Sequence, residues 1–187
     1  VHCMRVLLEA GASAAGAGVL LPLLANAADD DFAPHAGLDA FAQSLIDLGA
    51  DGHARISGGA SALHLALRAA LPGTARLLLA RGFDPNAADH SGQTALHLLM
   101  RLPGAGRDVV LTALLRAGAD PERRANDGET PLGRATLARH EQALRLLRWP
   151  NWKLPRRALM EADLPAAAQA GDRDAVAKLR ELGLPID

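Results

Sequence analysis

The sequence predicts an all-helical protein in which similar helical units stack side by side. Ala and Leu supply most of its apolar residues, aromatic residues make up 3 % of the chain, and β-branched residues are sparse. This composition favours helix over strand. An apolar stretch ending in Leu-Leu-x-x-Gly also recurs along the chain, which indicates a repeated structural unit. With a hydrophobic content of 49 % in 187 residues, the chain has enough apolar side chains to form a core.

The recurring stretch marks the end of one helix in each unit. Its last residue is glycine in all units but one, where asparagine takes its place. Both residues tolerate the left-handed backbone conformation that commonly ends a helix. Successive end residues are 38, 33, 36, 33 and 32 positions apart, which gives a period close to 33. These end residues are Gly11, Gly49, Gly82, Gly118, Asn151 and Gly183.

A second block precedes three of these helices. It reads Gly-Ala-Ser-Ala-Leu-His-Leu-Ala from Gly59, Gly-Gln-Thr-Ala-Leu-His-Leu-Leu from Gly92 and Gly-Glu-Thr-Pro-Leu-Gly-Arg-Ala from Gly128. Together with the repeat period, this pattern resembles the Gly-x-Thr-Pro-Leu-His-x-Ala block of the ankyrin repeat. The hydroxyl residues of the block are expected to cap the following helix, because their oxygen accepts a hydrogen bond from a free backbone amide. They are Ser61, Thr94 and Thr130.

The resemblance implies an ankyrin-repeat solenoid, an all-α fold of stacked helix-turn-helix units. Each unit consists of a turn, a short inner helix, a tight connection and an outer helix, and its apolar faces are covered by the neighbouring units. The prediction is a single domain over residues 1–187, with about four full repeats and partial or degenerate units at both ends. Its approximate units are 1–13 (partial), 14–51, 52–84, 85–120, 121–155 and 156–187 (degenerate).

Several departures from the regular period predict local irregularities. The two long spacings place extra residues between paired helices, at 29–37 and 101–106, where loops accept insertions and often contribute to binding. The unit from 14 to 51 lacks the second block. Its inner helix is expected near 19–28. The outer helix of the preceding partial unit is expected near 3–10. The segment 149–152, Trp-Pro-Asn-Trp, predicts an irregular junction before the last unit.

Composition and charge argue against several classes of function. The net charge is −1 and the sequence pI is about 6.7, so nucleic acid is not expected as a partner. Cys3 is the only cysteine, and it can form neither an internal disulfide nor a metal site by itself. We find no nucleophile elbow and no phosphate-binding glycine loop. The sequence therefore predicts no enzyme activity, no catalytic residues, no cofactor and no metal.

Two groups of residues admit a chemical and a structural interpretation. His64 and His97 occupy equivalent positions in successive units, which would suit a metal or catalytic pair, but Gly133 stands at the next equivalent position. The resemblance instead implies that these histidines link adjacent turns through hydrogen bonds, and we favour that interpretation. Acidic residues at 29–31 with His35 provide oxygen ligands for a hard cation. They lack the spacing of a calcium loop, so a solvated insertion is favoured.

The N-terminal region resembles a secretion signal, with Met4-Arg5, the apolar run 19–24 and the small residues 25–27. Because Glu9 interrupts it and its Leu-Leu-Glu-Ala-Gly segment fits the repeat, we interpret it as part of the solenoid. No run reaches the roughly 18 apolar residues of a membrane span. A cytoplasmic location is favoured, and membrane insertion by this segment is not expected.

One basic segment stands out locally. Between positions 145 and 157 the chain has several arginines and two tryptophans but no acidic residue. Arginine with exposed indole rings binds phosphates or stacks on bases, so an anionic ligand or a nucleic acid is a weaker alternative function. The favoured interpretation is that the tryptophans fill the irregular junction. The candidate patch consists of Arg145, Arg148, Trp149, Trp152, Arg156 and Arg157.

The resemblance implies a non-catalytic module that binds another protein through its turn tips and inner helices, on the concave face. The main alternative is a regulatory or targeting segment of a larger bacterial enzyme or membrane-anchored protein. The partner-binding residues expected on this face are Ser57, His90, Ser91, Gln93, Asn126, Asp127, Glu129, Arg68, Leu98, Arg101 and Arg134. Leu65, Leu137 and Ala138 are expected to extend the same exposed surface along the inner helices.

Overall fold

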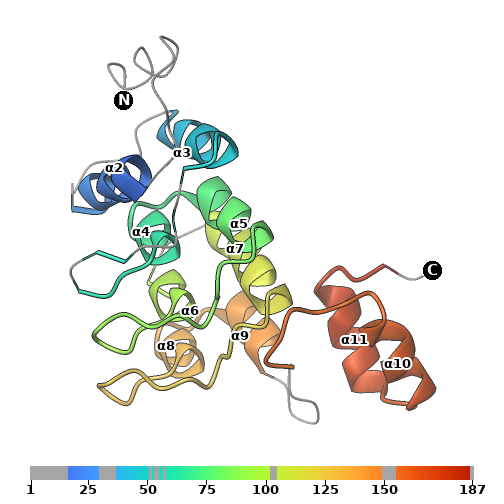
Figure 1. Ribbon diagram of the computed structural model, residues 1–187. Coiled ribbons are helices and arrows are strands. Elements are labelled where there is room, and N and C mark those ends of the chain that lie inside the picture. The colour runs from blue at the N-terminus through green and yellow to red at the C-terminus, as the bar shows by residue number, and fades with distance from the viewer. Residues whose placement is uncertain are drawn as a thin grey trace.

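The computed structural model describes residues 17–29, 37–50, 52, 55–56, 58–101, 105–148 and 155–185. In this part of the chain the regular elements are ten helices, and one isolated β-bridge pairs Ala88 with Thr94 (Figure 1). The all-helical prediction is confirmed. The helices are α2 (Ala17–Asp29), α3 (Leu38–Asp47), α4 (Ala62–Arg68), α5 (Pro72–Ala80), α6 (Ala95–Leu99), α7 (Ala105–Arg116), α8 (Pro131–Leu137), α9 (Glu141–Leu147), α10 (Asp163–Gln169) and α11 (Arg173–Glu181).

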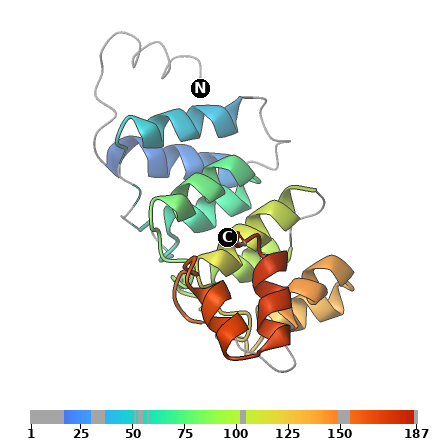
Figure 2. The ribbon, with the colours of Figure 1, turned by 90° about the vertical axis from the view of Figure 1, so that its right-hand side faces the viewer.

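The first eight of these helices form two parallel rows. The inner row runs α2, α4, α6 and α8, and the outer row runs α3, α5, α7 and α9; each helix packs against the next one in its row. Each inner helix also packs against the outer helix that follows it in the chain. Figures 1 and 2 show these pairs following one another along the stack. This arrangement is the predicted helix-turn-helix solenoid.

Local sequence explains where the helices begin and end. Thr130 caps α8, because its Oγ1 accepts the backbone N–H of Gly133 at 3.0 Å, and Pro131 fills the first helical position. Ser61 and Thr94 form reciprocal capping boxes with His64 and His97. The outer helices end before glycines with left-handed φ, among them Gly49, Gly82 and Gly118 at 82° to 89°.

Leucines from both rows form one continuous core. Leu20, Leu45, Leu63, Leu96 and Leu111 are almost completely buried, so each helix pair covers the apolar face of the next one. Leu65 is buried as well, which corrects the expectation that it extends the exposed surface.

The signal-like stretch lies largely within α2. The leucines Leu20, Leu21 and Leu24 are buried, and α2 packs against α3 and α4. The inner helix expected near 19–28 is therefore present, and it extends slightly further in both directions. The outer helix expected near 3–10 lies outside the described residues, as do most of the loop 29–37 and the candidate cation site within it. None of the described helices is long and apolar enough to cross a membrane.

The extra residues before Gly118 lengthen a helix instead of a loop. The expected insertion covered 101–106, but α7 already begins at Ala105. It has 12 residues where α5 has 9, which accounts for a spacing of 36 instead of 33. In the sequence, Ala105 and Gly106 directly follow Pro103-Gly104. The residues after Gly106 are compatible with helix, so a helix can begin directly after the Pro-Gly pair.

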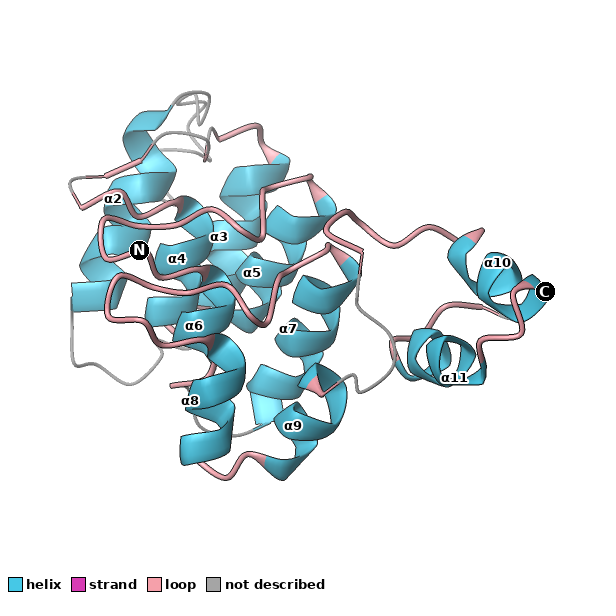
Figure 3. Cartoon of the chain, turned by 90° about the horizontal axis from the view of Figure 1, so that it is seen from below, coloured by secondary structure: helices cyan, strands magenta, loops and turns pink. Residues whose placement is uncertain are grey.

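The last pair, α10 and α11, leaves the stack. These two helices pack mainly against each other and lie beside the outer row, whereas α2 to α9 follow one another along it (Figures 1 and 3). The Leu159 N–H donates to Arg116 O at 2.7 Å, and Lys178 Nζ donates to Arg145 O at 2.5 Å. Helix α9 ends at Leu147, two residues before Trp149, in agreement with a break near the predicted junction.

Candidate binding surface

Three tight turns project from the inner row on one side of the stack (Figure 1). We call them fingers: finger 1 at residues 55–56 and 58–60, finger 2 at 88–94 and finger 3 at 125–130. Each finger is closed by a backbone hydrogen bond across its base, at 2.9 to 3.1 Å between nitrogen and oxygen. The pairs are Ile56 N–H with Ala60 O, Asp89 N–H with Gln93 O, and Ala125 N–H with Glu129 O.

Backbone hydrogen bonds also join each finger to the next one. The His90 N–H of finger 2 donates to Gly58 O, and the Asn126 N–H of finger 3 donates to Ser91 O, both at 2.9 Å. The Asn126 side-chain amide donates to His90 O at 2.9 Å. Since these links use mostly main-chain groups, they hold the three tips in one array largely independently of the side chains that the tips expose.

Two glycines allow this close stacking. Gly59 and Gly92 have left-handed φ values of 75° and 74°. A Cβ atom at Gly59 would lie 2.5 Å from His90 Cδ2, and one at Gly92 would lie 2.8 Å from the Asn126 nitrogen. Glycine is required at both positions, because any other residue would be strained and would also push the next finger away.

His64 links the start of its own helix to the next finger. The Ser61 N–H donates to His64 Nδ1 at 3.3 Å, and His64 Nε2 lies 2.9 Å from Gln93 O of the next finger. A carbonyl oxygen can only accept, so Nε2 carries the proton of a neutral imidazole. Burial lowers the pKa of His64, because the charged form would be desolvated.

His97 repeats this arrangement one unit later. Its Nδ1 accepts the Thr94 N–H at 3.1 Å, its Nε2 lies 3.3 Å from Glu129 O, and burial lowers its pKa. Both histidines therefore connect adjacent units through hydrogen bonds, as the structural interpretation predicts. Among the described residues, no group of three or more His, Cys, Asp or Glu side chains is arranged to hold a metal ion.

Arg134 occupies the inner-helix position below fingers 2 and 3. Its side chain is only 8 % exposed, which corrects the expectation that it lies on the exposed face. The Nε atom donates to Glu129 Oε2 at 2.6 Å, and Nη2 lies 3.4 Å from Asp127 Oδ2. Nη1 donates to Gln93 Oε1 at 3.3 Å and to His97 O at 3.4 Å. Arg134 is therefore a clamp that joins the two fingers.

Most of the other predicted partner-binding residues are accessible. Leu98 and Gln93 are partly buried, and Ser57 lies outside the described residues. Leu137, one repeat beyond Arg101, is 80 % exposed at the end of the inner row, and Ala138 beside it is exposed. The exposed members of the predicted set are His90, Ser91, Asn126, Asp127, Glu129, Arg68 and Arg101.

This surface has opposite charges at its two edges. Finger 3 carries the carboxylates of Asp127 and Glu129, both about half exposed even though they contact Arg134. Arg68 ends α4, and Arg101 lies two residues after the end of α6. The two arginines occupy equivalent positions in successive units. A complementary partner would therefore present basic groups to finger 3 and acidic groups to the helix ends.

The basic segment 145–157 is partly neutralised by acidic residues outside it. Arg145 pairs with Glu181 at 3.4 Å, Arg156 with Asp120 at 3.3 Å, and Arg157 with Asp163 at 2.5 Å. The hydrogen bond from Arg157 lowers the pKa of Asp163 and raises the pKa of Arg157. Arg148 is exposed, and Trp149 and Trp152 lie outside the described residues. These ion pairs reduce the positive charge available to an anionic ligand.

Two further links between units were not predicted from sequence. Asp39 of α3 caps the N-terminus of α5, accepting the N–H groups of Gly73 at 2.8 Å and Thr74 at 2.7 Å. Asn86 connects neighbouring turns, because its amide donates to Gly118 O and accepts the Asp120 N–H, both at 2.8 Å. Caps were expected from residues next to each helix in the sequence, whereas Asp39 belongs to the preceding unit. Asn86 follows Asp84-Pro85, a turn signal that marks its place in the unit.

Comparison with known proteins identifies the repeated units. Residues 63–154 match the family model for ankyrin repeats, in three copies. The matched segment extends from α4 to beyond α9, and it includes fingers 2 and 3 with their clamp. A search of curated proteins finds no match to this chain.

Proposed function

The chain belongs to the ankyrin repeat family, and from that premise we propose that it binds a protein partner through the fingers and the adjoining ends of α4 and α6. Ankyrin repeats are generally protein-protein interaction modules and are typically non-catalytic. The proposed contact residues are the accessible members of the predicted set, with Arg134 in a supporting role.

One observation carries this proposal: the fingers are stacked through main-chain hydrogen bonds. His90 N–H bonds Gly58 O, Asn126 N–H bonds Ser91 O, and the buried histidines hold the carbonyl groups of Gln93 and Glu129. The tips are therefore ordered before any partner arrives, so binding costs little conformational entropy. Most of their exposed side chains are not needed for folding and are available for recognition.

The partner that suits this surface has a divided charge pattern. Basic side chains would lie against Asp127 and Glu129, and acidic side chains would lie near Arg68 and Arg101. Such complementarity mainly increases the association rate and the specificity. We expect affinity for a natural partner to weaken as salt rises, because the contacts lie in partly exposed positions.

A double variant, in which one substitution removes a side chain and the other reverses a charge, tests the assignment. Proteins captured from a bacterial lysate by the wild-type chain are identified, purified and titrated against the double variant His90→Ala, Arg101→Glu. Both positions are exposed, so the variant should keep the wild-type fold, which circular dichroism and thermal unfolding check. We expect the Kd to rise at least about tenfold.

Arg173→Glu is the matched control, since Arg173 is an exposed arginine on α11, outside the finger surface. It should change the Kd by less than about twofold. If the captured partners bind the double variant as tightly as the wild type, the finger surface is not the binding site.

A further inference from the structure

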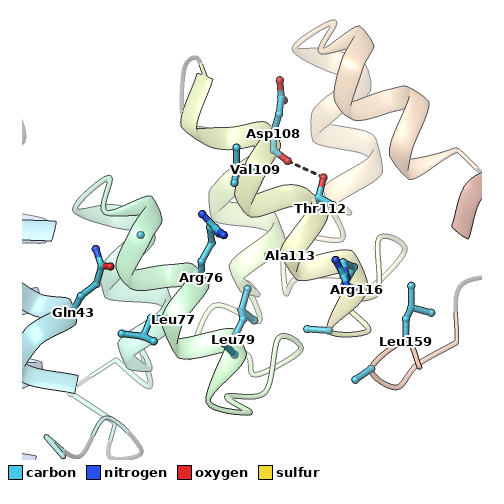
Figure 4. A pocket seen from close by; sticks show the side chains of 14 residues that line it. Gln43, Arg76, Leu77, Leu79, Asp108, Val109, Thr112, Ala113, Arg116 and Leu159 are labelled. Carbon is cyan, nitrogen blue, oxygen red and sulfur yellow. Dashed lines mark hydrogen bonds between the residues drawn. The ribbon is translucent and has the colours of Figure 1, made fainter. Parts of the chain in front are cut away.

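A groove lies on the outer row of helices, away from the fingers. It has a volume of about 1000 Å³ and is open to solvent. Figure 4 shows it between α5 and α7, with Gln43 of α3 toward one end and Leu159 toward the other. The groove therefore crosses three successive outer helices and reaches the segment that leads to α10.

The floor of the groove is apolar. Leu77 and Leu79 line it from α5, Val109 and Ala113 from α7, and Leu159 from the segment before α10. Val109 is 49 % exposed, one of the most exposed large hydrophobic residues of the described chain. Val109 and Ala113 lie on one face of α7, because residues four apart are neighbours on a helix. Of these five lining residues, Val109 is exposed, and the other four are partly or fully buried. An apolar floor with polar groups around it is a common feature of binding grooves.

Two arginines give the groove a positive character. Arg76 of α5 and Arg116 of α7 both line it and are exposed. Neither guanidinium lies within ion-pair distance of a carboxylate in the described part of the chain. Asp108 is the one carboxylate among the described lining residues, and its Oδ1 lies 3.7 Å from Arg107 Nε. A ligand with acidic groups would supply the charges that the two arginines lack.

The chain itself illustrates how a polypeptide is held at this groove. The segment before α10 crosses the end of α7, where the Leu159 N–H donates to Arg116 O and the Leu159 side chain lines the groove. Gly118 permits this contact, because a Cβ atom there would lie 2.5 Å from Arg157 O. At this end of the groove, a segment of the chain is therefore held by a main-chain hydrogen bond with an apolar side chain next to it.

We propose that this groove is a second docking site, for a segment of a partner protein in which large apolar side chains lie next to carboxylates. The apolar floor takes the hydrophobic side chains, and Arg76 and Arg116 pair with the acidic ones. Among the described residues that line the groove, none is aromatic, so a base would find no ring on which to stack. Because the fingers project from the opposite row, the protein can bind one partner on each face.

Display selection followed by titration tests the proposal. A random peptide library is panned against the intact chain, and enriched peptides are labelled with fluorescein and measured by anisotropy. We expect peptides that combine Leu, Phe or Trp with Asp or Glu. Their Kd should rise at least about tenfold with Arg76→Glu, Arg116→Glu, and a similar amount with Val109→Asp. All three positions are exposed, so wild-type thermal unfolding is expected of these variants.

The finger variant His90→Ala, Arg101→Glu serves as the control on the opposite face, and it should bind the same peptides within about twofold of the wild type. Rising salt should weaken binding, since the arginines are exposed. The proposal is wrong if no such peptide is enriched, or if the enriched peptides bind the groove variants as well as the wild type. Either result leaves the finger assignment intact, because that rests on different residues.

Discussion

His64 and His97 each form hydrogen bonds with two successive repeats through a single neutral imidazole ring. Nδ1 accepts from the start of its own helix, while Nε2 donates to a carbonyl of the next finger. Protonation at Nδ1 would remove the acceptor and place a charge in a buried site. These residues therefore couple the stack to pH.

We predict that the protein loses stability as the pH falls below about 6.5. The folded-state pKa of both histidines is lowered from 6.5, so below that value the unfolded chain binds more protons. Their contribution is complete above pH 6.5 and decreases as the pH falls toward the folded-state pKa. Urea unfolding at pH 7.5, 6.5 and 5.5 measures the effect.

The variant His64→Gln, His97→Gln is the control for this prediction. It should be less stable at pH 7.5 by about 1–2 kcal/mol for each lost hydrogen bond. Its free energy of unfolding should then change less between pH 6.5 and 5.5 than that of the wild type. Equal slopes in the two proteins would assign the pH dependence to other groups.

Arg134 is the second residue that acts between repeats. Replacing it with methionine keeps much of the side-chain volume but removes the bonds to Glu129, Asp127 and Gln93. We predict a loss of about 1–3 kcal/mol in the free energy of unfolding, limited by the partial exposure of the carboxylates. Arg123→Met, at an exposed position, should lie within about 0.5 kcal/mol of the wild type. Similar stability of the two variants would show that the clamp contributes little.

At the scale of elements, contacts between units determine where helices begin and how fingers pack. The N-terminus of α5 is capped by Asp39 of α3, and finger 3 lies against Gly92 of finger 2. Gly128 holds the equivalent place in finger 3, but a Cβ atom there would meet no described atom within 4 Å. The two glycines therefore share a backbone conformation and differ in what covers them.

This difference predicts unequal effects of alanine. Gly128→Ala should cost about 1–2 kcal/mol, the cost of a left-handed φ for a residue with a Cβ atom. Gly92→Ala should cost clearly more, because the added atom also displaces Asn126 and the hydrogen bond from its N–H to Ser91 O. Urea unfolding of both variants measures the difference. Equal losses would indicate that finger 3 adjusts at no cost.

At the scale of the whole molecule, stability is distributed along the stack. Each pair from α4 to α7 is covered by neighbours on both sides, whereas α10 and α11 pack mainly against each other. The contacts of the last pair with the stack include the Arg145–Glu181 ion pair, which is partly exposed. Exposed ion pairs contribute little to stability, and α10 and α11 share few contacts with the helices of the stack, so we expect this pair to be held more weakly.

We predict that α10 and α11 open more readily than the centre of the stack. Native-state hydrogen exchange should show the strongest amide protection in α4 to α7 and weaker protection in α10 and α11. Peptides covering 62–80 and 105–116 are compared with those covering 163–181 in a mass-spectrometric time course. If the last pair is as protected as α5 and α7, it is instead part of the same cooperative unit.

Local sequence was sufficient to predict the fold class and the fingers. The repeat period, the helix-ending glycines and the hydroxyl caps act within a few residues of where they stand, so the helices followed from them. The roles of His64 and His97 followed from the resemblance to the ankyrin repeat. The positions of His90, Asn126 and Arg101 on an exposed face followed from the same resemblance.

Tertiary structure decided the features that depend on how separate units meet. Arg134 was expected to be exposed, but the acidic side chains of finger 3 and Gln93 of finger 2 surround it. The basic segment near Trp149 has no acidic residue of its own, and Glu181, Asp120 and Asp163 provide its partners from outside. Periodicity specifies which face a side chain occupies within its unit. How units pack together decides which partners a side chain has. It also decides the departure of α10 and α11 from the stack and the groove on the outer row.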